Sequence, residues 1–517
     1  MIYFINFGMP DKKSGIEHAE LKRLKLFEAH EYPCKIITRD WYIDAHATAQ
    51  RAGVDDDHLL NMFDYFQHTQ HVEQNILKAQ DIDLGLKNLL YSEEVDNNRY
   101  IVTRTSDRLV ARINYDKKFA KQVTSVELFD NVGNLYRVDF YDSRGFKSQI
   151  QWYTPDNKIG TKEWLDINGR VKLKAFYRYG VSDKKNLIHT GWWLDDTEGK
   201  KYTFDTVDSL FEHFLNLVNS QGKNIFVLDR SLLADAALTR MKRKAFTVYH
   251  FHSSQVGDSS DPMNSMMNNH YEYGLVNINK YSAVISATQH QTDDIKKRFD
   301  PKVKMYTIPV GIVPEKVLSA PRVSMSKRTY GKVIAVARIA SEKRLDDLVR
   351  AVKIVHDNIP EVTLDLYGYA DSTNNFAEKK HVQKVADDLN ISDLVTFKGY
   401  VNDVASVYDD AQIFGLTSTM EGFNLAIMEA ISHGVLGLTY DVNYGPNNII
   451  EDAVNGYIVE NGNYEELAHK MINVLSNNDL LQKLSTGAYE TSLRYSSDNI
   501  WKLWKQLIED AQTELRG

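Results

Sequence analysis

The stretch that decides the fold is Ile413-Phe414-Gly415-Leu416-Thr417-Ser418-Thr419-Met420-Glu421-Gly422-Phe423-Asn424-Leu425-Ala426-Ile427-Met428-Glu429-Ala430. Its first four residues are short and apolar, as in a buried parallel strand. Leu425, Met428 and Ile431 then recur about every three residues, which predicts a helix that begins near Phe423. A strand, a polar turn and a helix in this order are typical of an α/β domain.

The turn in this stretch has the features of an anion site. The first N–H groups of a helix lack partners within the helix, and the helix dipole favours negative charge there. Gly422 lets a phosphate approach the backbone closely. Glu421 lies in the turn, and Glu429 follows about 12 Å further along the helix. This span fits a nucleotide diphosphate sugar, with one carboxylate on the sugar and one on the ribose. The alternative is an ordinary buried turn with solvated glutamates.

Length and composition describe a globular protein of two or three domains. The chain has 517 residues, of which 43% are hydrophobic and 26% charged. A membrane-spanning helix needs about eighteen consecutive apolar residues, and no segment of the sequence approaches this length. The single cysteine, Cys34, excludes an internal disulfide and fits a reducing cytoplasm. The net charge of −8 argues against a general nucleic-acid binder.

The first part of the chain predicts a Rossmann-like domain made of residues 1–50 and 190–311; the resemblance described below implies that this is the acceptor domain. Ser14 and Gly15 stand where its first helix begins beside a strand end, which is another place for phosphate; a tight turn is the alternative. His250 and His252 follow a later strand. Ligands of α/β sheets bind beyond the carboxyl ends of strands. No third ligand motif accompanies the two histidines, so we expect no metal site. The alternative to a ligand-binding role is that both are ordinary polar loop residues.

Residues 51–189 differ in pattern from the rest. They are expected to be helical and amphipathic up to about residue 100, with Asp55-Asp56-Asp57 at a helix N-terminus rather than in a metal site. Regular Asp/Asn/Gly turns from about 100 to 180 predict a β-meander. The meander has more basic than acidic residues although the chain as a whole is acidic. It is therefore either a basic solvated face or a docking module for a partner or an anionic acceptor.

A second Rossmann-like domain, for a nucleotide sugar, is expected at residues 312–495, opening with a linker at 312–328 and followed by a C-terminal helix at 496–517. Arg338 and Lys343 follow its first strand. The guanidinium fork and the lysine point charge suit a diphosphate.

These motifs together resemble retaining glycosyltransferases of family 4 with the GT-B fold. The residues that carry the resemblance are Gly15, Arg338, Lys343, Glu421, Gly422, Glu429, Gly445-Pro446 and Asn455-Gly456. The stretch Ser14–Ala19 and the β-rich insertion are closer to bacterial protein O-glycosyltransferases of the accessory-Sec adhesin pathway. Polyol-phosphate (teichoic acid) α-glycosyltransferases share the insertion and the core motifs. One departure is Asn424, where many relatives have glycine.

The resemblance implies two Rossmann-like domains that face a cleft, and a metal-independent, retaining transfer from a UDP-sugar without a cofactor. GlcNAc or Glc would pass to Ser/Thr hydroxyls of a Ser-rich surface or secreted protein; the alternative acceptor is poly(glycerol- or ribitol-phosphate) teichoic acid. A homologous partner subunit would dock on the insertion, in the cytoplasm or at the inner face of the membrane. A non-catalytic partner subunit and a pyridoxal-dependent phosphorylase are less compatible with the retained charged pairs and the absence of a pyridoxal motif.

The resemblance also implies a role for each site residue. Arg338 and Lys343 neutralise the leaving diphosphate. Backbone amides of Phe423, Asn424 and Leu425 hold phosphate or sugar hydroxyls. Glu421 contacts the donor sugar and Glu429 the ribose, while His250 or His252 lies against the donor sugar.

Overall fold

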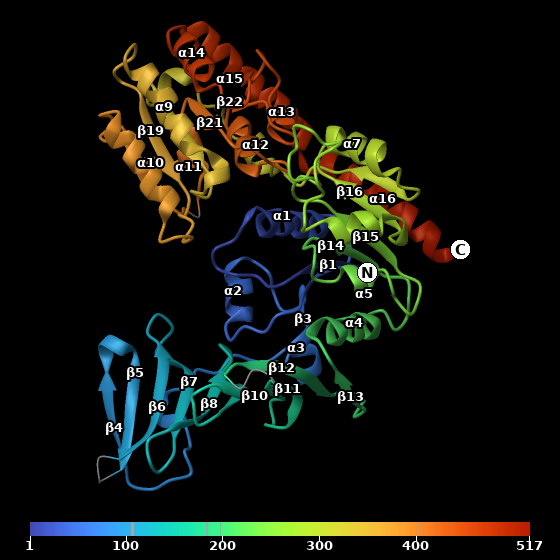
Figure 1. Ribbon diagram of the computed structural model, residues 1–517. Coiled ribbons are helices and arrows are strands. Elements are labelled where there is room, and N and C mark those ends of the chain that lie inside the picture. Colours follow the sequence, from blue (N-terminus) through green and yellow to red (C-terminus); the bar gives the residue numbers. More distant parts are fainter. Residues whose placement is uncertain (105–107, 182–184, 197, 402) are drawn as a thin grey trace. The chain divides into compact units, whose positions relative to one another are not determined.

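The computed structural model describes residues 1–104, 108–181, 185–196, 198–401 and 403–517 (Figure 1). The chain divides into two compact units. The first is formed by residues 1–14 and 32–245, and the second by residues 15–31 and 246–517.

The first unit contains four parallel strands in the order β14-β1-β2-β3. These strands are β1 (Ile2–Asn6), β2 (Cys34–Thr38), β3 (Leu59–Asn61) and β14 (Ile225–Leu228). The helices of this unit are α2 (Ala45–Arg51), α3 (Met62–Gln67), α4 (Val207–Val218) and α5 (Asp235–Leu238). Almost every residue of the four strands is buried, as is typical of parallel strands that are covered on both faces.

Ten antiparallel strands lie between α3 and α4 in the chain, and each pairs with the next (Figure 1). They are β4 (Leu89–Glu94), β5 (Arg99–Arg104), β6 (Leu109–Asp116), β7 (Gln122–Phe129), β8 (Leu135–Tyr141), β9 (Lys147–Tyr153), β10 (Ile159–Leu165), β11 (Val171–Tyr179), β12 (Leu187–Asp195) and β13 (Lys201–Phe204). The predicted β-rich insertion is therefore confirmed, and its strands extend beyond residues 100–180 on both sides.

The prediction that residues 50–100 are mainly helical is wrong. Asp55 does not begin a helix; its carboxylate accepts from the His58 N–H at 2.9 Å in a turn before β3. Asn61 then caps α3 by accepting from the Phe63 N–H at 2.8 Å. Further along, Ala79 and Ile82 are buried against residues of the meander. The apolar residues that suggested an amphipathic helix belong instead to a covering segment around Ala79 and Ile82, which packs on the antiparallel sheet.

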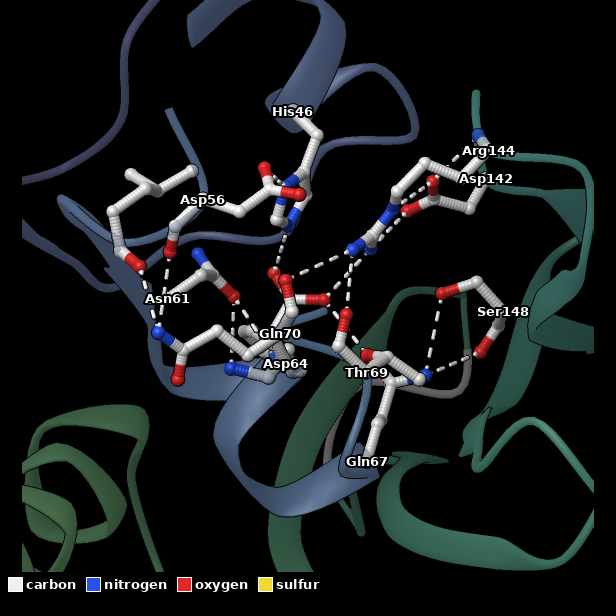
Figure 2. A network of polar contacts seen from close by, with 12 residues as sticks. His46, Asp56, Asn61, Asp64, Gln67, Thr69, Gln70, Asp142, Arg144 and Ser148 are labelled. Carbon is white, nitrogen blue, oxygen red and sulfur yellow. Dashed lines mark hydrogen bonds and ion pairs between the residues drawn. The ribbon is translucent and has the colours of Figure 1, made fainter. Parts of the chain in front are cut away.

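A buried network of polar side chains joins the meander to α2 and α3; it consists of His46, Asp56, Asp64, Thr69, Asp142 and Arg144 (Figure 2). Arg144, in the turn between β8 and β9, bonds Asp64 at 3.0 Å and Asp142 at 2.8 Å. His46 reaches Asp64 with Nε2 at 2.8 Å and Asp56 with Nδ1 at 2.7 Å. The network thus satisfies charges that would be costly to bury alone.

The backbone of the same turn is also fixed. The Asn75 N–H donates to the Arg144 carbonyl at 2.9 Å, and the Ser143 N–H donates to the Ile43 carbonyl at 2.9 Å. Gly145 has φ +92°, and a Cβ there would lie 1.9 Å from the Asn75 carbonyl oxygen. Only glycine fits this close approach.

The second unit contains strands β15 (Phe246–His250), β16 (Ala283–Ser286) and β17 (Lys304–Thr307), which are parallel and adjacent in that order. Its other sheet is parallel and has six strands in the order β20-β19-β18-β21-β22-β23. These are β18 (Lys332–Val336), β19 (Thr363–Tyr367), β20 (Val395–Gly399), β21 (Ile413–Leu416), β22 (Leu436–Tyr440) and β23 (Gly456–Val459).

The helices of the second unit are α1 (Gly15–Ala29), α6 (Glu272–Val276), α7 (Gln289–Phe299), α8 (Glu315–Leu318), α9 (Leu345–His356), α10 (Ala377–Asp388), α11 (Ala405–Asp410), α12 (Leu425–Ser432), α13 (Pro446–Ile449), α14 (Tyr464–Leu475), α15 (Asn478–Ser492) and α16 (Ser497–Arg516). A large apolar core includes residues of the six-stranded sheet, α9, α10, α14 and α15. Among the described residues, no helix has both the length and the apolar character needed to cross a bilayer.

The predicted strand–turn–helix is confirmed as β21, the turn 417–424 and α12. The helix begins at Leu425 rather than near Phe423. Asn424 has φ +75°, which is not helical, and its side chain accepts from the Ile427 N–H at 3.0 Å as an N-cap.

Candidate active site

Two loops of the six-stranded sheet, the one after β18 and the turn 417–424, are joined by backbone and side-chain hydrogen bonds. The Thr419 N–H donates to the Glu342 carbonyl at 2.9 Å, and the Thr417 hydroxyl donates to the Lys343 carbonyl at 2.9 Å. Because both loops follow the carboxyl ends of adjacent parallel strands, they lie at the edge where α/β sheets bind ligands.

Lys343, Glu421 and Asn424 form the polar centre of this region. Lys343 Nζ lies 2.7 Å from Glu421 Oε1, and Asn424 Nδ2 donates to the same oxygen at 3.0 Å. The side chain of Lys343 is 17% exposed and that of Glu421 is 10% exposed. A lysine ammonium has three donors, so this ion pair leaves capacity for an anion.

Arg338 contacts a different pair of carboxylates. It forms ion pairs with Glu342 in its own loop and with Asp371, which follows β19. Sequence reasoning missed both acids. The position of Asp371 after a neighbouring parallel strand was the available signal, because such loops meet at one edge of the sheet.

Gly422 brings the loop after β15 against the turn 417–424. A Cβ on Gly422 would lie 2.3 Å from the His252 carbonyl oxygen and 2.7 Å from Ser253 Cα. The backbone contact therefore gives a reason for glycine here besides the predicted approach of a phosphate.

The two histidines after β15 differ in environment. His250 is buried and its Nδ1 lies 3.3 Å from Arg23 Nη1, whereas His252 is partly exposed. Their ring centres are 4.1 Å apart. His252 is thus the histidine that combines partial exposure with contact to the backbone at Gly422.

Phe423 anchors the end of the turn in the core. It is 4% exposed, and its ring packs edge-on against Tyr495 with centres 5.6 Å apart. A Cβ on Gly445 would lie 1.8 Å from the Phe423 carbonyl oxygen, and one on Gly311 would lie 2.7 Å from its ring. These close contacts fix the start of α12, including Leu425.

The remaining motif residues downstream support the backbone. Pro446 occupies the first turn of α13. The buried Asn455 accepts from the Glu451 N–H at 2.8 Å and donates to the Ile449 carbonyl at 3.1 Å. A Cβ on Gly456 would lie 1.8 Å from the Gly437 carbonyl oxygen. The Gly-Pro and Asn-Gly motifs therefore hold the chain that follows the sheet edge.

Glu429 lies on α12 between two donors. Lys22 Nζ of α1 is 2.5 Å from Oε1, and the hydroxyl of Tyr408 on α11 is 3.3 Å from Oε2. Burial and the nearby Glu429 carboxylate raise the pKa of Tyr408 well above its usual value, so the phenol remains a donor. Sequence analysis missed Lys22, although Gly15 had already pointed to this helix.

Ser14 and Gly15 have contrasting surroundings. In the first unit, the Ser14 hydroxyl accepts from Arg230 Nη2 at 3.0 Å. In the second unit, Gly15 begins α1, and a Cβ there would meet nothing within 4 Å. No steric reason therefore requires glycine at the start of this helix.

Comparisons with known proteins agree with this architecture. Residues 320–491 match the family model "Glycosyl transferases group 1", and residues 95–181 match the "GtfB middle domain". The chain is 24% identical to a UDP-N-acetylglucosamine–peptide N-acetylglucosaminyltransferase GtfA subunit of Streptococcus gordonii, covering 99% of each. It is also 24% identical to a poly(glycerol-phosphate) alpha-glucosyltransferase of Bacillus subtilis (strain 168), covering 98% of this chain and 75% of the relative.

A solved structure with the same fold is that of the pneumococcal O-GlcNAc transferase GtfA in complex with UDP and GlcNAc. Its TM-score is 0.83 at 20% sequence identity, and the match covers 99% of this chain and 98% of that one.

Residues 320–491 therefore match the group 1 glycosyltransferases, and the chain as a whole has the GT-B fold. Over nearly its whole length its sequence is similar to that of a GtfA subunit and of a polyol-phosphate glycosyltransferase. The predicted fold class and family resemblance are confirmed; the roles of individual site residues stay predictions.

Proposed function

We propose that the chain transfers GlcNAc or Glc from a UDP-sugar to Ser/Thr hydroxyls of a Ser-rich protein, with retention of anomeric configuration. The observation that carries the proposal is the Lys343–Glu421 pair, which joins the loop after β18 to the turn that leads into α12. The two loops together offer a cation, a carboxylate and a helix N-terminus, which suits a diphosphate joined to a sugar.

Binding of the donor would exchange the present ion pairs for contacts with the substrate. The diphosphate would take Lys343 from Glu421 and Arg338 from Asp371, and the freed Glu421 would accept sugar hydroxyls. The two cations would then stabilise negative charge on the departing UDP, a role that metal ions fill in other enzymes. Since positive charge is supplied by side chains, we expect activity in excess EDTA.

The acceptor hydroxyl would attack from the face from which UDP departs. His252 would lie against the donor sugar, because its backbone touches Gly422 beside Glu421. Amides at Phe423–Leu425 would hold phosphate or sugar oxygens, and Glu429 would accept from the ribose. Gly15 and Ser14 would line the approach to the phosphates.

The similarity of the chain to a peptide N-acetylglucosaminyltransferase GtfA subunit supports a protein acceptor and, since that relative is a subunit, a partner chain. Exposed apolar side chains at and near the edge strand β4 offer a docking surface: Leu90 is 54% exposed, Tyr91 44% and Val95 65%.

Deleting the insertion is a poor test of this docking surface. Phe63 of α3 packs against Trp164 of the meander with ring centres 4.9 Å apart, so the deletion would uncover core residues. Leu90→Asp is a more specific test: it should weaken partner binding without unfolding the enzyme.

A second acceptor class, polyol phosphate, is supported by a groove of about 760 Å³ on the insertion. Its charged lining residues are Asp83, Arg104, Arg108, Asp130, Arg137, Asp139 and Lys147. Asp139 is already paired with Arg137 at 2.5 Å and with Lys147 at 3.0 Å. The groove therefore offers basic donors, and the charges of Arg137 and Lys147 are already partly neutralised by Asp139. Phosphate binding there should become weaker as the salt concentration rises, because salt screens exposed charges over a Debye length of about 8–10 Å.

The test is UDP release from a panel of UDP-sugars, each with a Ser-rich peptide or with polyglycerol phosphate, in the presence of EDTA. The proposal expects transfer of GlcNAc or Glc to the peptide. Transfer only to polyglycerol phosphate, weakening steeply with salt, would establish the second acceptor class. Activity that is lost in EDTA and restored by manganese would contradict the metal-independent mechanism.

A further inference from the structure

The carboxylate of Glu429 is held by a lysine that no motif of the sequence includes. Lys22 Nζ is 2.5 Å from Glu429 Oε1, while Tyr408 donates to the other oxygen at 3.3 Å. The side chains of Lys22 and Glu429 are 23% and 26% exposed. The pair is therefore shielded from water on most sides but still reachable by a ligand.

Lys22 is presented by a helix that other contacts hold in place. Phe27 of α1 is fully buried and packs edge-on against Trp504 of α16, with ring centres 5.5 Å apart. Arg23 is also buried and lies over the same Trp504 ring at 5.3 Å. The position of α1 thus does not depend on the Lys22–Glu429 pair.

The same face of α1 meets the sheet edge at a second point. His18 is one turn before Lys22, and its Nε2 lies 3.4 Å from the hydroxyl of Tyr400, just after β20. Glu429 lies on the helix that follows β21. Successive turns of α1 therefore face the loop after β20 and the helix α12.

A bare carboxylate at this place would oppose a nucleotide. Glu429 would bring a negative charge close to a diphosphate that is itself negative, and like charges in a partly buried site repel more strongly than in water. Lys22 offsets this repulsion. It also leaves Glu429 able to accept hydrogen bonds, because a carboxylate offers about four acceptor positions and the lysine uses one.

We propose that Lys22 is a positioning residue for the nucleotide: it fixes Glu429 for the two ribose hydroxyls and neutralises its charge beside the diphosphate. This inference rests on the proposed use of a UDP-sugar. It assigns Lys22 to binding of the nucleotide and not to the chemical step.

The test compares Lys22→Met with Lys25→Met. Both remove one positive charge from α1 and keep an unbranched stem, but Lys25 is exposed. UDP affinity is measured by titration calorimetry, and KM and kcat are measured for UDP-GlcNAc. We expect Lys22→Met to weaken UDP binding and raise KM by about tenfold or more, as losing a hydrogen bond to a charged group does, with little change in kcat. Lys25→Met should match the wild type, and Lys22→Arg should restore part of the affinity.

Unchanged UDP affinity in Lys22→Met, or an equal loss in Lys25→Met, would overturn the role of Lys22. Tighter binding in Lys22→Met would also overturn it, because the lysine would then block the site. A wild-type protein that binds no UDP and transfers no sugar would instead overturn the proposed function, and the inference with it.

Discussion

The buried network around Arg144 and the ion pairs beside the turn 417–424 use the same chemistry in opposite environments. In the network, the side chains of His46 and Arg144 are 2% and 4% exposed. Beside the turn, Lys343 is 17% exposed and Arg338 is 39% exposed.

The difference in exposure separates structural ion pairs from exchangeable ones. Breaking a buried pair leaves a charge without water or partner, so the pair is locked. The Arg338 pairs are partly exposed and can separate at small cost because water solvates both ends. Lys343 is partly exposed but its partner Glu421 is buried, so a charged ligand rather than water has to replace that pair. The network is therefore suited to holding the insertion in place, and the ion pairs beside the turn are suited to being replaced by a substrate.

The largest effect is expected for Arg144→Met. Removing one member of a buried ion pair should cost about 3–5 kcal/mol, because Asp64 and Asp142 would be left buried without their partner. Urea unfolding followed by tryptophan fluorescence measures this loss.

The matched control is Arg178→Met, since Arg178 is on the meander but exposed, and its substitution should stay within about 0.5 kcal/mol. A loss below about 1 kcal/mol for Arg144→Met would show that the network is not a structural lock.

The next effect concerns turnover. Lys343→Ala should lower kcat by about a hundredfold or more, because it removes a charge contact with the leaving diphosphate. The fold should survive, because Lys343 lies in a loop and Asn424 still donates to Glu421. Lys353→Ala is the control, since Lys353 forms an i,i+4 pair with Asp357 on the surface of α9. Near-normal turnover in folded Lys343→Ala would contradict the predicted contact between this lysine and the leaving diphosphate.

Gly422→Ala should destabilise the second unit by about 1–3 kcal/mol, because the added methyl group overpacks against the His252 backbone. It should also weaken donor binding by moving Glu421 away from the loop after β15. Gly257→Ala is the control, as a Cβ there would meet its nearest atom at 3.7 Å. Equal stability of the two variants, measured by thermal unfolding, would contradict the close backbone contact.

The smallest effect is a pH dependence of the network. Burial alone would lower the pKa of His46, but its hydrogen bond with Asp64 and the negative charge of Asp64 raise the pKa above its usual value. The stabilisation is therefore fully present below the unfolded pKa of about 6.5 and is lost as pH rises through the folded pKa. The urea midpoint of the first unit should fall as the pH rises above about 6.5, and His46→Gln should flatten this fall. An identical pH profile in His46→Gln would contradict a charged His46.

Local sequence pattern was sufficient for the strand–turn–helix at 413–430, because apolar spacing and a glycine in the turn are properties of neighbouring residues. It was not sufficient for the partners of Arg144. The sequence predicted the turn Asp142-Ser143-Arg144-Gly145, and Gly145 does have a positive φ. That the arginine turns inward to Asp64 depends on residues about eighty positions away in the chain, which no local pattern reports.

The candidate site shows the same limit. Lys343 and Glu421 were predicted from motifs and lie together, but Lys22 and Asp371 are brought in by tertiary packing. The error at residues 50–100 has a related cause. The covering segment around Ala79 and Ile82 buries its apolar residues against the sheet at spacings similar to those of an amphipathic helix.

The backbone contacts between Asn75 and the turn Ser143–Gly145 have a consequence for recombination between homologous chains. A crossover placed just before β4 and just after β13 would transplant all ten strands but leave Asn75, Asp64 and His46 from the recipient. The donated Arg144 would then face acids selected for another turn. The unit that has to be exchanged is consequently longer than the inserted sheet: it begins just before α2, and its contacts are kept only when residues 43–75 travel with the strands.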